Sequence, residues 1–379
     1  MRVLYLMDDM GGGTGNHVFS LVPRIEGVEP VFATTGRRVR TRLNVDDSTV
    51  YKVPPKGRFD PPVVHQARML ADLRRFALSA RVDLIHSYFF WSIFFGRILK
   101  RMLGVPLVEN REDLGFQWGT LEYALLRMGS GAPDRVICVA EAVRRQAARR
   151  EGLPPARTTT VWNGIDPEEL DADGGEGDLR AELGVPADAP VVGIVANFRR
   201  VKRVDRLIRA APRLLDRLPD LRVLISGRGV EEERLRALVR EMGLEERVLF
   251  AGFRRRLAPV YRAADITVLT SETEGCSIAV LESFHFGRPV VATDVGGNGE
   301  LVRNGENGFL VPEWNEAAFA DRVVRLLTDR ALLERMGRAG RELVRERHGI
   351  DGVAREYGRI YEEVAAEGAR HRKDPSVEK

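Results

Sequence analysis

The stretch TSETEGCSIAVLESFHFGRPVVATDVGGNGELV, residues 270–302, sets the pattern from which the rest of the chain can be interpreted. An apolar run ends at Thr270, a short loop follows, and an apolar-periodic segment begins near Ser277 and stops at Gly287. This pattern predicts a strand, a loop and a helix. The first N–H groups of a helix have no partner within it, and the helix dipole favours negative charge there. The unit can therefore bind a diphosphate.

Two glutamates in this stretch carry most of its chemical information. Glu274 lies in the loop, where its carboxylate can accept hydrogen bonds from hydroxyl groups, and Gly275 beside it lets the backbone approach a ligand closely. Glu282 lies about one and a half turns into the helix and can accept from a ribose diol. The alternative is that both are solvated side chains without a function, and the two residues taken alone favour that alternative.

Alternating strand and helix patterns extend from this stretch in both directions. In the C-terminal half, strands are expected at 191–196, 222–226, 247–250, 266–270, 289–292 and 308–311, and helices at about 203–218, 231–242, 277–286, 316–328 and 330–347. In the N-terminal half, apolar runs recur at 2–7, 30–34, 82–86, 105–109, 135–139 and 158–162. Most are separated by helical patterns such as 65–80. In each half, this alternation predicts a parallel sheet with helices on both faces.

The chain is thus expected to be an α/β protein with two Rossmann-like, doubly wound domains. The acidic, Gly-rich segment at 167–178 is interpreted as a linker, which places an N-terminal domain at 1–168 and a second domain at 169–352. A further helix at about 353–368 is expected to pack back on the N-terminal domain. Doubly wound sheets bind ligands outside the carboxyl ends of their strands. Two such sheets facing each other predict a site in an interdomain cleft.

Composition and charge argue against several classes of protein. The net charge is only +4 and the arginines are dispersed along helical patterns, so a nucleic-acid partner is not expected. Cys138 and Cys276 lie far apart without metal-ligand spacing, which indicates a reducing compartment rather than a disulfide framework or a zinc site. The apolar stretch at the N-terminus is too short for a signal peptide, and no run of about 18 apolar residues follows, so a cytoplasmic protein is expected.

The spacing of Glu274 and Glu282, with seven residues between them, and the following GRPVVATDVGGNGELV resemble the family 4 retaining glycosyltransferases, which have the GT-B fold. The segments VWNGID (161–166), RVLISGRG (222–229), RVLFAGF (247–253) and YRAADITVLTS (261–271) extend the resemblance, and Asn163 falls in the hinge signature. The resemblance implies that Glu274 contacts the donor sugar and Glu282 the ribose. It also implies that the donor diphosphate and sugar are held by the backbone of Gly275, Cys276, Ser277, Ile278 and Ala279.

The segment ANFRRVKRVDRLI, residues 196–208, is where this family places an Arg and a Lys that face the donor diphosphate. Lys202 matches the Lys, but Asn197 stands where the Arg is common; Arg199 is the best substitute, and Arg200 the second. Two cations suit the chemistry because charge builds on the leaving phosphate as the glycosidic bond breaks. The DxD spelling at 171–173 falls in the expected linker, so no metal and no cofactor are expected.

The N-terminal half offers weaker candidates. MGGGTGNHV, residues 10–18, is interpreted as a Gly-rich loop in which Gly12 and Gly13 contact the donor phosphate, with a helix from about Asn16. The spacing does not give GxGxxG, so a nicotinamide site is not supported. The family often has a sugar-contacting His near 108–113, where this chain has none. The substitutes considered at the acceptor or sugar site are Glu109, Arg111, Glu112, Asp113 and, after another strand, His86, although a lone His is more often structural.

The stretch at 87–104 is unusually aromatic and ends with Arg97, Lys100 and Arg101. It could contact a lipid acceptor or a membrane surface. The alternative, a helix packed against the N-terminal sheet, is favoured because the run is apolar almost all round, as in buried helices.

Taken together with these patterns, the family resemblance implies a metal-independent retaining glycosyltransferase that moves a sugar from a nucleotide-diphosphate sugar to an acceptor hydroxyl. A UDP-sugar is the favoured donor and GDP-mannose the alternative. The acceptor is a sugar, a lipid-linked or a small molecule, which implies biosynthesis of a polysaccharide, a glycolipid or a small glycoside. Two rivals are a sugar-nucleotide epimerase of the same architecture and a non-catalytic nucleotide-sugar-binding protein. The sequence does not indicate an oligomeric state.

Overall fold

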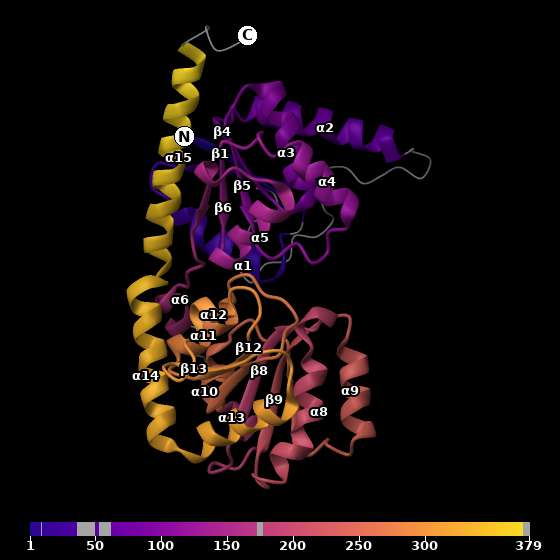
Figure 1. The fold of residues 1–379 in the computed structure, drawn as a ribbon, viewed down its shortest axis with the longest axis vertical. Coiled ribbons are helices and arrows are strands. Elements are labelled where there is room, and N and C mark those ends of the chain that lie inside the picture. Colours follow the sequence, from indigo (N-terminus) through magenta and orange to yellow (C-terminus); the bar gives the residue numbers. More distant parts are fainter. Residues whose placement is uncertain (9, 36–49, 53–61, 173–176, 374–379) are drawn as a thin grey trace. The chain divides into compact units, whose positions relative to one another are not determined.

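The computed structural model describes residues 1–379 except 9, 36–49, 53–61, 173–176 and 374–379. The chain forms two compact units. Unit 1 comprises Met1–Asn163 together with Ile350–Lys379, and unit 2 comprises Gly164–Gly349. Each unit is an α/β structure built around a parallel sheet (Figure 1).

The sheet of unit 1 has the strand order β3-β2-β1-β4-β5-β6-β7, and all pairs are parallel. Its strands are β1 (Arg2–Met7), β2 (Glu29–Thr34), β3 (Val50–Lys52), β4 (Leu84–Tyr88), β5 (Leu107–Arg111), β6 (Arg135–Cys138) and β7 (Thr158–Thr160). The strand order reverses between β1 and β4, and sheets of this kind bind ligands at such a switch point, outside the carboxyl ends of the strands.

Helices cover both faces of this sheet. They are α1 (Gly12–Leu21), α2 (Pro62–Ser79), α3 (Phe90–Leu103), α4 (Thr120–Met128), α5 (Glu141–Glu151) and α15 (Ile350–Lys373), with short 3-10 turns at Val22–Arg24 and Pro155–Arg157. The side chains of β1 point alternately to the two faces of the sheet and pack against a different layer of helices on each face. Val3, Tyr5 and Met7 pack with residues of α1 and α15, whereas Leu4 and Leu6 pack with residues of α2 and α3.

The sheet of unit 2 has the order β10-β9-β8-β11-β12-β13 and is also parallel. Its strands are β8 (Val191–Asn197), β9 (Arg222–Arg228), β10 (Val248–Gly252), β11 (Ile266–Leu269), β12 (Val290–Thr293) and β13 (Gly308–Val311). The order reverses between β8 and β11. The segments that follow these two strands are therefore expected to form a ligand site.

The helices of unit 2 again lie on both faces of the sheet. They are α6 (Pro167–Ala172), α7 (Leu179–Glu182), α8 (Val204–Leu215), α9 (Glu232–Glu241), α10 (Ala258–Ala263), α11 (Ile278–His285), α12 (Asn298–Leu301), α13 (Glu316–Thr328) and α14 (Arg330–Arg347), with a 3-10 turn, η4, at Arg200–Lys202. One core joins α8, α9 and α13 to Val192 and Ile194 of β8, and another joins α7 and α10 to Val191.

The doubly wound, two-sheet architecture predicted from the sequence is confirmed, but two local predictions are wrong. The expected linker contains helix α6, because Asp166 Oδ1 accepts the N–H groups of Glu168 and Glu169 and Leu170 is buried. Accordingly, the first unit ends at Asn163 rather than at residue 168. The Gly-rich loop expected at residues 10–18 is already helical from Gly12.

The aromatic stretch at 87–104 forms α3. Seven of its residues are buried, including Phe90, Ile93 and Phe95, so most of this helix packs inside unit 1 as the favoured alternative predicted. No helix in the described part of the chain is long and apolar enough to cross a membrane.

Candidate functional site

The loop between β11 and α11 brings two of the predicted residues into direct contact. Lys202 Nζ donates to Glu274 Oε1 at 2.7 Å and to Oε2 at 2.8 Å. The Ser271 hydroxyl donates to Glu274 Oε1 at 2.5 Å. Glu274 is buried, whereas about a quarter of the Lys202 side chain stays exposed, at 24%. The arrangement places a fixed carboxylate and an accessible cation at the carboxyl ends of β8 and β11.

Backbone hydrogen bonds hold η4 and this loop together. The Thr270 hydroxyl donates to the carbonyl of Arg203 at 2.9 Å and more weakly to that of Lys202 at 3.2 Å, and the Glu272 N–H donates to the carbonyl of Val201 at 2.9 Å. The position of Lys202 therefore does not depend on its ion pair alone, because the loop also fixes the backbone on either side of it.

A glycine after β12 is required where the chain crosses the Glu274 backbone. Gly296 has φ +57°, and a Cβ there would lie 1.8 Å from the Glu274 carbonyl oxygen. The neighbouring Gly297 N–H donates to the same carbonyl at 3.3 Å. A side chain at Gly296 would thus displace the loop that carries Glu274.

The amino end of α11 carries the backbone groups predicted to bind a diphosphate. Ser277 is the N-cap, and within the described residues its side chain makes no capping hydrogen bond. Gly275, Cys276 and Ser277 are buried, while Ile278 and Ala279 are half-buried. Because the first turn of a helix has no intrahelical acceptor for its N–H groups, this end of α11 supplies donors and a positive dipole next to Lys202 and Glu274.

Glu282 lies in α11 and is held by a residue that the sequence interpretation did not single out. The Tyr261 hydroxyl of α10 donates to Glu282 Oε2 at 2.7 Å. The Tyr261 ring stacks on Phe286 with 5.5 Å between centroids. The segment YRAAD was recognised only as a family-like motif, and its Tyr fixes the orientation of the Glu282 carboxylate.

The arginines of residues 196–208 divide into two groups. Arg199 and Arg200 have exposed side chains beside the end of β8. Arg203 pairs with Asp205 at 3.0 Å and with Glu272, and these hydrogen bonds raise its pKa. The Arg206 guanidinium donates to the Thr270 carbonyl at 3.0 Å and lies 5.1 Å from the centre of the Trp314 ring. Arg203 and Arg206 therefore stabilise the loops, as opposed to being merely solvated on the surface.

The ends of β9 and β10 add two residues that the sequence interpretation missed. The Arg228 guanidinium lies 3.8 Å from the centre of the Phe253 ring. Phe253 is 42% exposed, although it follows directly after a strand. An exposed aromatic ring with an Arg on it can stack a nucleobase. In the sequence, Phe253 could have been recognised as the last residue of the motif RVLFAGF.

In unit 1, the first turn of α1 and the end of β5 meet at Glu112. The Thr14 hydroxyl donates to Glu112 Oε2 at 3.1 Å, and the Asn110 side-chain amide donates to Oε1. Burial raises the pKa of Glu112 to about 7, against the smaller lowering effect of these two hydrogen bonds. Gly12 and Gly13 begin the same helix, so they lie one to two residues before Thr14.

Arg111 is not available to a ligand as the sequence interpretation proposed. Its guanidinium donates to Glu151 at 2.6 Å and to Glu109 at 2.9 Å, and Glu109 also pairs with Arg97 at 2.7 Å. Burial raises the pKa of Glu109, but the charges and hydrogen bonds of Arg97 and Arg111 outweigh it and the pKa is lowered overall. These residues form a closed, buried ionic network beneath the strand ends.

His86 is also buried inside unit 1, which agrees with the structural role that the sequence interpretation favoured for a lone His over the sugar site. It lies in the middle of β4, fully buried, with Nδ1 2.6 Å from the Tyr361 hydroxyl of α15. Burial lowers the pKa of His86 to about 3, so the ring is neutral. Asp113 accepts the Gly115 N–H at 2.6 Å within its own loop. Asn163 is buried at the last position of this part of unit 1.

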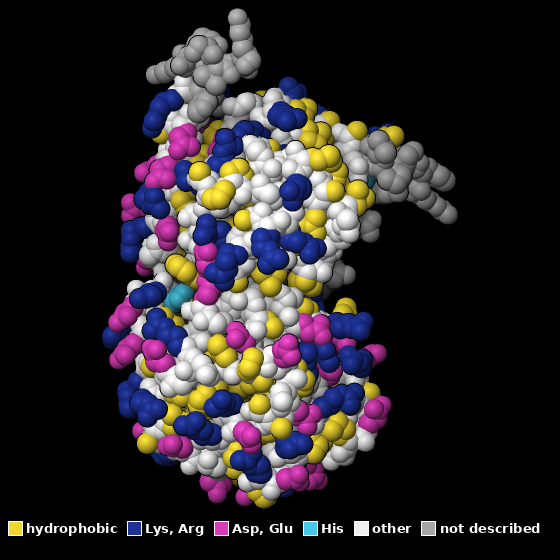
Figure 2. Space-filling model, viewed as in Figure 1, with side chains coloured by type: hydrophobic (Ala, Val, Ile, Leu, Met, Phe, Trp, Pro, Cys, Tyr) yellow, Lys and Arg dark blue, Asp and Glu magenta, His cyan; other side chains and the backbone are white. Residues whose placement is uncertain are grey.

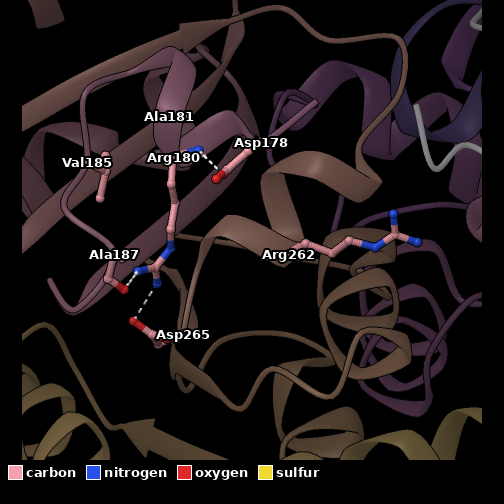
Figure 3. Close-up of a pocket in the computed structure, with 7 residues that line it drawn as sticks. All are labelled: Asp178, Arg180, Ala181, Val185, Ala187, Arg262 and Asp265. Carbon is pink, nitrogen blue, oxygen red and sulfur yellow. Dashed lines mark hydrogen bonds and ion pairs between the residues drawn. The ribbon is translucent and has the colours of Figure 1, made fainter. Parts of the chain in front are cut away.

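A pocket lined by α7, by Val185 and Ala187 of the segment before β8, by α10 and by Asp265 lies at the opposite end of the sheet of unit 2 (Figure 3). Its Arg180 donates to Asp265 at 3.1 Å and to the carbonyls of Ala187, Ala189 and Ala263. Asp265 also accepts the Val191 N–H at 2.7 Å. These groups close the amino ends of the strands, so the pocket is separate from the Lys202–Glu274 site. Among the described residues, no group of three or more His, Cys, Asp or Glu could hold a metal.

Comparisons with known proteins match both units to glycosyltransferase families. A family profile described as "Glycosyl transferases group 1" matches residues 176–343, and one described as "Glycosyltransferase Family 4" matches residues 11–169. A D-inositol 3-phosphate glycosyltransferase of Streptomyces bingchenggensis is 32% identical over 74% of this chain and 67% of its own length. An N-acetyl-alpha-D-glucosaminyl L-malate synthase of Bacillus anthracis is 30% identical over 63% of this chain and 62% of its own length.

Two solved structures share the fold over nearly the whole chain. Sucrose-phosphate synthase from Thermosynechococcus elongatus has a TM-score of 0.82 and 23% identity, and covers 97% of this chain and 100% of its own. HepE of Anabaena, in complex with UDP-glucose, has a TM-score of 0.81 and 20% identity, and covers 96% of this chain and 100% of its own.

Proposed function

The chain belongs to the family 4 glycosyltransferases of the GT-B fold, and from this premise we propose that it moves a sugar from a nucleoside-diphosphate sugar to an acceptor hydroxyl with retention of configuration. The observation that carries the proposal is the contact between Lys202 and Glu274 at the amino end of α11. It joins a cation, a carboxylate and free helical N–H donors at the carboxyl edge of one sheet, which suits a diphosphate attached to a sugar.

In this proposal, Lys202 and Arg199 neutralise the leaving diphosphate. Negative charge builds on the phosphate oxygen as its bond to the anomeric carbon breaks, and fixed cations stabilise that charge most in the transition state. The N–H groups of residues 275–279 hold the same phosphates. Glu274, fixed by Lys202 and Ser271, accepts hydrogen bonds from the sugar hydroxyls. Neither a metal nor a cofactor has a step in this scheme.

The nucleoside is assigned to Glu282, Arg228 and Phe253. Glu282 keeps its carboxylate oriented through Tyr261 and accepts from the ribose diol. The Phe253 ring stacks the base, with Arg228 fixing the ring. A uracil base is favoured because a neighbour with the same fold was solved with UDP-glucose, and guanine with mannose is the alternative.

Gly12 and Gly13 of unit 1 are assigned to the donor phosphate, and the residues considered for acceptor contacts in this unit are Glu112 and Asn163. Glu112 is the strongest of them because it is half-buried, lies at the end of β5, and is oriented by Thr14 and Asn110. Relatives named for inositol 3-phosphate and L-malate favour a small-molecule acceptor over a polysaccharide or a glycolipid. We expect the reaction to take place in the cytoplasm because it would consume a nucleotide sugar.

The chemical step then needs no enzyme nucleophile. The bond between the anomeric carbon and the phosphate oxygen breaks, and the acceptor oxygen attacks the same face through a short-lived oxocarbenium-like state. The proton of the acceptor hydroxyl passes to the departing phosphate, so charge and atoms balance. Retaining glycosidases, in contrast, use a carboxylate nucleophile and a second carboxyl group.

A donor screen tests this proposal. Thermal shifts with UDP-, GDP- and ADP-sugars, each with magnesium and with chelator, should show stabilisation by one nucleotide class that is independent of the metal. With that donor, transfer should be lost in Glu274→Ala while the nucleotide still binds. An epimer formed from the donor without an acceptor would identify an epimerase instead. Undiminished biological activity of Glu274→Ala would identify a non-catalytic binding protein.

A further inference from the structure

Three buried hydrogen bonds link the turn after β12 to Glu274. The Asn298 side-chain amide donates to the Thr293 carbonyl at 2.9 Å, and the Thr293 hydroxyl donates to the Ser271 carbonyl at 2.7 Å. The Ser271 hydroxyl in turn donates to Glu274 Oε1 at 2.5 Å. Asn298, Thr293 and Ser271 are all buried. We call these three residues the Glu274 support, because their hydrogen bonds lead from the turn to the carboxylate.

The same turn also contacts the backbone of Glu274. The Gly297 N–H donates to the Glu274 carbonyl at 3.3 Å, and a Cβ at Gly296 would lie 1.8 Å from that oxygen. The side chain and the backbone of Glu274 are therefore both held by one segment, residues 293–298. Because the groups of the Glu274 support are buried, the loss of one hydrogen bond would leave its partner unsatisfied. The loop after β11 thus depends on the turn after β12 for its conformation.

The Glu274 support differs from the ion pairs on the surface of unit 2. Figure 2 shows dark blue Lys and Arg side chains interspersed with magenta Asp and Glu side chains over this unit. An exposed pair such as Arg303 and Glu306, at 2.8 Å, is screened by water and stabilises little. The donors of the Glu274 support are instead uncharged and buried. They can hold the carboxylate in one orientation without supplying a charge of their own.

The two oxygens of the Glu274 carboxylate are engaged unequally. Oε1 accepts from both Ser271 and Lys202, whereas among the described residues Oε2 accepts only from Lys202, at 2.8 Å. A carboxylate oxygen can accept two hydrogen bonds, so Oε2 keeps one acceptor position for a further donor. The Lys202 ammonium has three N–H groups and directs two of them to Glu274, which leaves the third for a phosphate oxygen.

We infer that Ser271 and Thr293 are positioning residues for sugar transfer, which hold Glu274 Oε1 and leave Oε2 as the atom that accepts from a hydroxyl of the donor sugar. This inference rests on the proposed function and extends it to a named atom and to the turn after β12. A bound diphosphate competes with Glu274 for the charge of Lys202, so an uncharged donor that stays on the carboxylate preserves its orientation. Loss of either positioning residue should therefore slow the bond-breaking step and leave nucleotide affinity unchanged.

Thr293→Val tests the inference, because valine keeps the branched shape of threonine and removes the hydroxyl donor. The assay measures UDP or GDP released from UDP-glucose, UDP-N-acetylglucosamine and GDP-mannose, with D-inositol 3-phosphate, L-malate or water as the acceptor. With the donor that wild type uses, kcat should fall about tenfold, because one buried hydrogen bond is lost. The dissociation constant for UDP or GDP, from calorimetric titration, should change by less than about twofold. Thr293→Ser keeps the hydroxyl and should recover most of the rate.

Ser271→Ala removes the hydrogen bond to Oε1 itself. It should show the same separation of kcat from nucleotide affinity as Thr293→Val, with a larger fall in kcat. If Thr293→Val did not fold, Ser271→Ala would decide the question by the same two measurements. Wild-type kcat in Ser271→Ala would overturn the inference.

Thr267→Val is the matched control. Thr267 is a buried residue of β11 whose hydroxyl oxygen lies 2.6 Å from that of Ser283, and it is not part of the Glu274 support. It should lower the urea midpoint of unfolding as Thr293→Val does, but leave kcat unchanged. The inference is overturned if Thr293→Val keeps the wild-type kcat, if both valine variants lower kcat equally, or if nucleotide affinity falls together with kcat. A wild type that releases no nucleotide from any of the three donors would overturn the proposed function, and the inference with it.

Discussion

Two clusters of charged side chains, one in each unit, look alike in the sequence and differ in the structure. Both place acids and bases at the ends of parallel strands. In unit 2, Lys202 pairs with Glu274 but keeps about a quarter of its side chain exposed, at 24%. In unit 1, Arg97, Glu109, Arg111 and Glu151 have almost no exposure and balance one another. A closed network stabilises the fold, whereas an open pair beside a helix end can engage a ligand.

The largest expected effect comes from a substitution that breaks the buried ionic network of unit 1. Arg111→Met should lower the free energy of unfolding by about 3–5 kcal/mol, because it leaves Glu109 and Glu151 buried with less compensation. Urea unfolding followed by circular dichroism measures it. The control is Arg199→Met, which removes an exposed guanidinium and should change stability by no more than about 0.5 kcal/mol. Wild-type stability of Arg111→Met would show that the network is not structural.

The next largest effect is expected from breaking the partly exposed pair of Lys202 and Glu274. Lys202→Met should reduce kcat/KM for transfer by about 10²–10³, since one fixed cation is lost from the leaving group. Steady-state kinetics with the donor found in the screen measure it. Lys202→Arg, which keeps the charge, should recover part of the loss. If Lys202→Met transferred sugar at the wild-type rate, the diphosphate would have to be held elsewhere.

A smaller effect should distinguish Tyr261 from Tyr123, two tyrosines that each donate a buried hydrogen bond. Tyr261→Phe removes the donor to Glu282 but keeps the stacking on Phe286, so nucleotide affinity should fall by about 1 kcal/mol, or several-fold. Calorimetric titration with the nucleotide measures it. Tyr123→Phe in unit 1 removes donors to the carbonyls of Leu114 and Gly115 and should leave that affinity unchanged. Equal losses in both variants would argue against the ribose assignment.

The last expected effect is a pH dependence at Glu112. Its pKa is raised from 4.5 to about 7 by burial, so the folded chain keeps a proton that the unfolded chain has released. The contribution of this group to the free energy of unfolding should therefore fall as pH rises from about 4.5 to about 7. Glu112→Gln should remove that decline in thermal unfolding. The control Glu141→Gln should not, because its hydrogen bond to Arg144 lowers the pKa of Glu141.

Much of the fold was predictable because it is encoded locally. Alternating apolar runs and helical periods predicted both sheets, and the apolar run ending at Thr270 with the apolar period that begins near Ser277 predicted the strand–loop–helix unit that the structure contains. The wrong predictions came from local sequence patterns that are compatible with both a loop and a helix. The Gly-rich, acidic segment at 167–178 has the composition of a linker, yet Asp166 caps a helix there. The glycines at 12 and 13 are typical of a loop, yet they begin α1.

The structure brings the candidate residues Lys202 and Glu274 of unit 2 into contact, whereas it buries the unit 1 candidates Arg111 and His86, for a physical reason. Lys202 and Glu274 belong to motifs with their own loop and helix signals. Arg111, Glu112 and His86 have no such context, and their roles depend on what buries them. The partner of Arg111 of β5 is Glu151 of helix α5, and the partner of His86 is Tyr361, 275 residues away. No local pattern reports such neighbours.

The sequence by itself determined the two parallel sheets and the family, and it supplied the candidate residues for the donor site, because periodicity and motif spacing are properties of neighbouring positions. Only the tertiary structure decided which charged side chains are buried and which remain accessible to solvent. The physical reason is that the state of a charged or apolar group depends on its surroundings. Those surroundings come from segments that meet only when the chain folds.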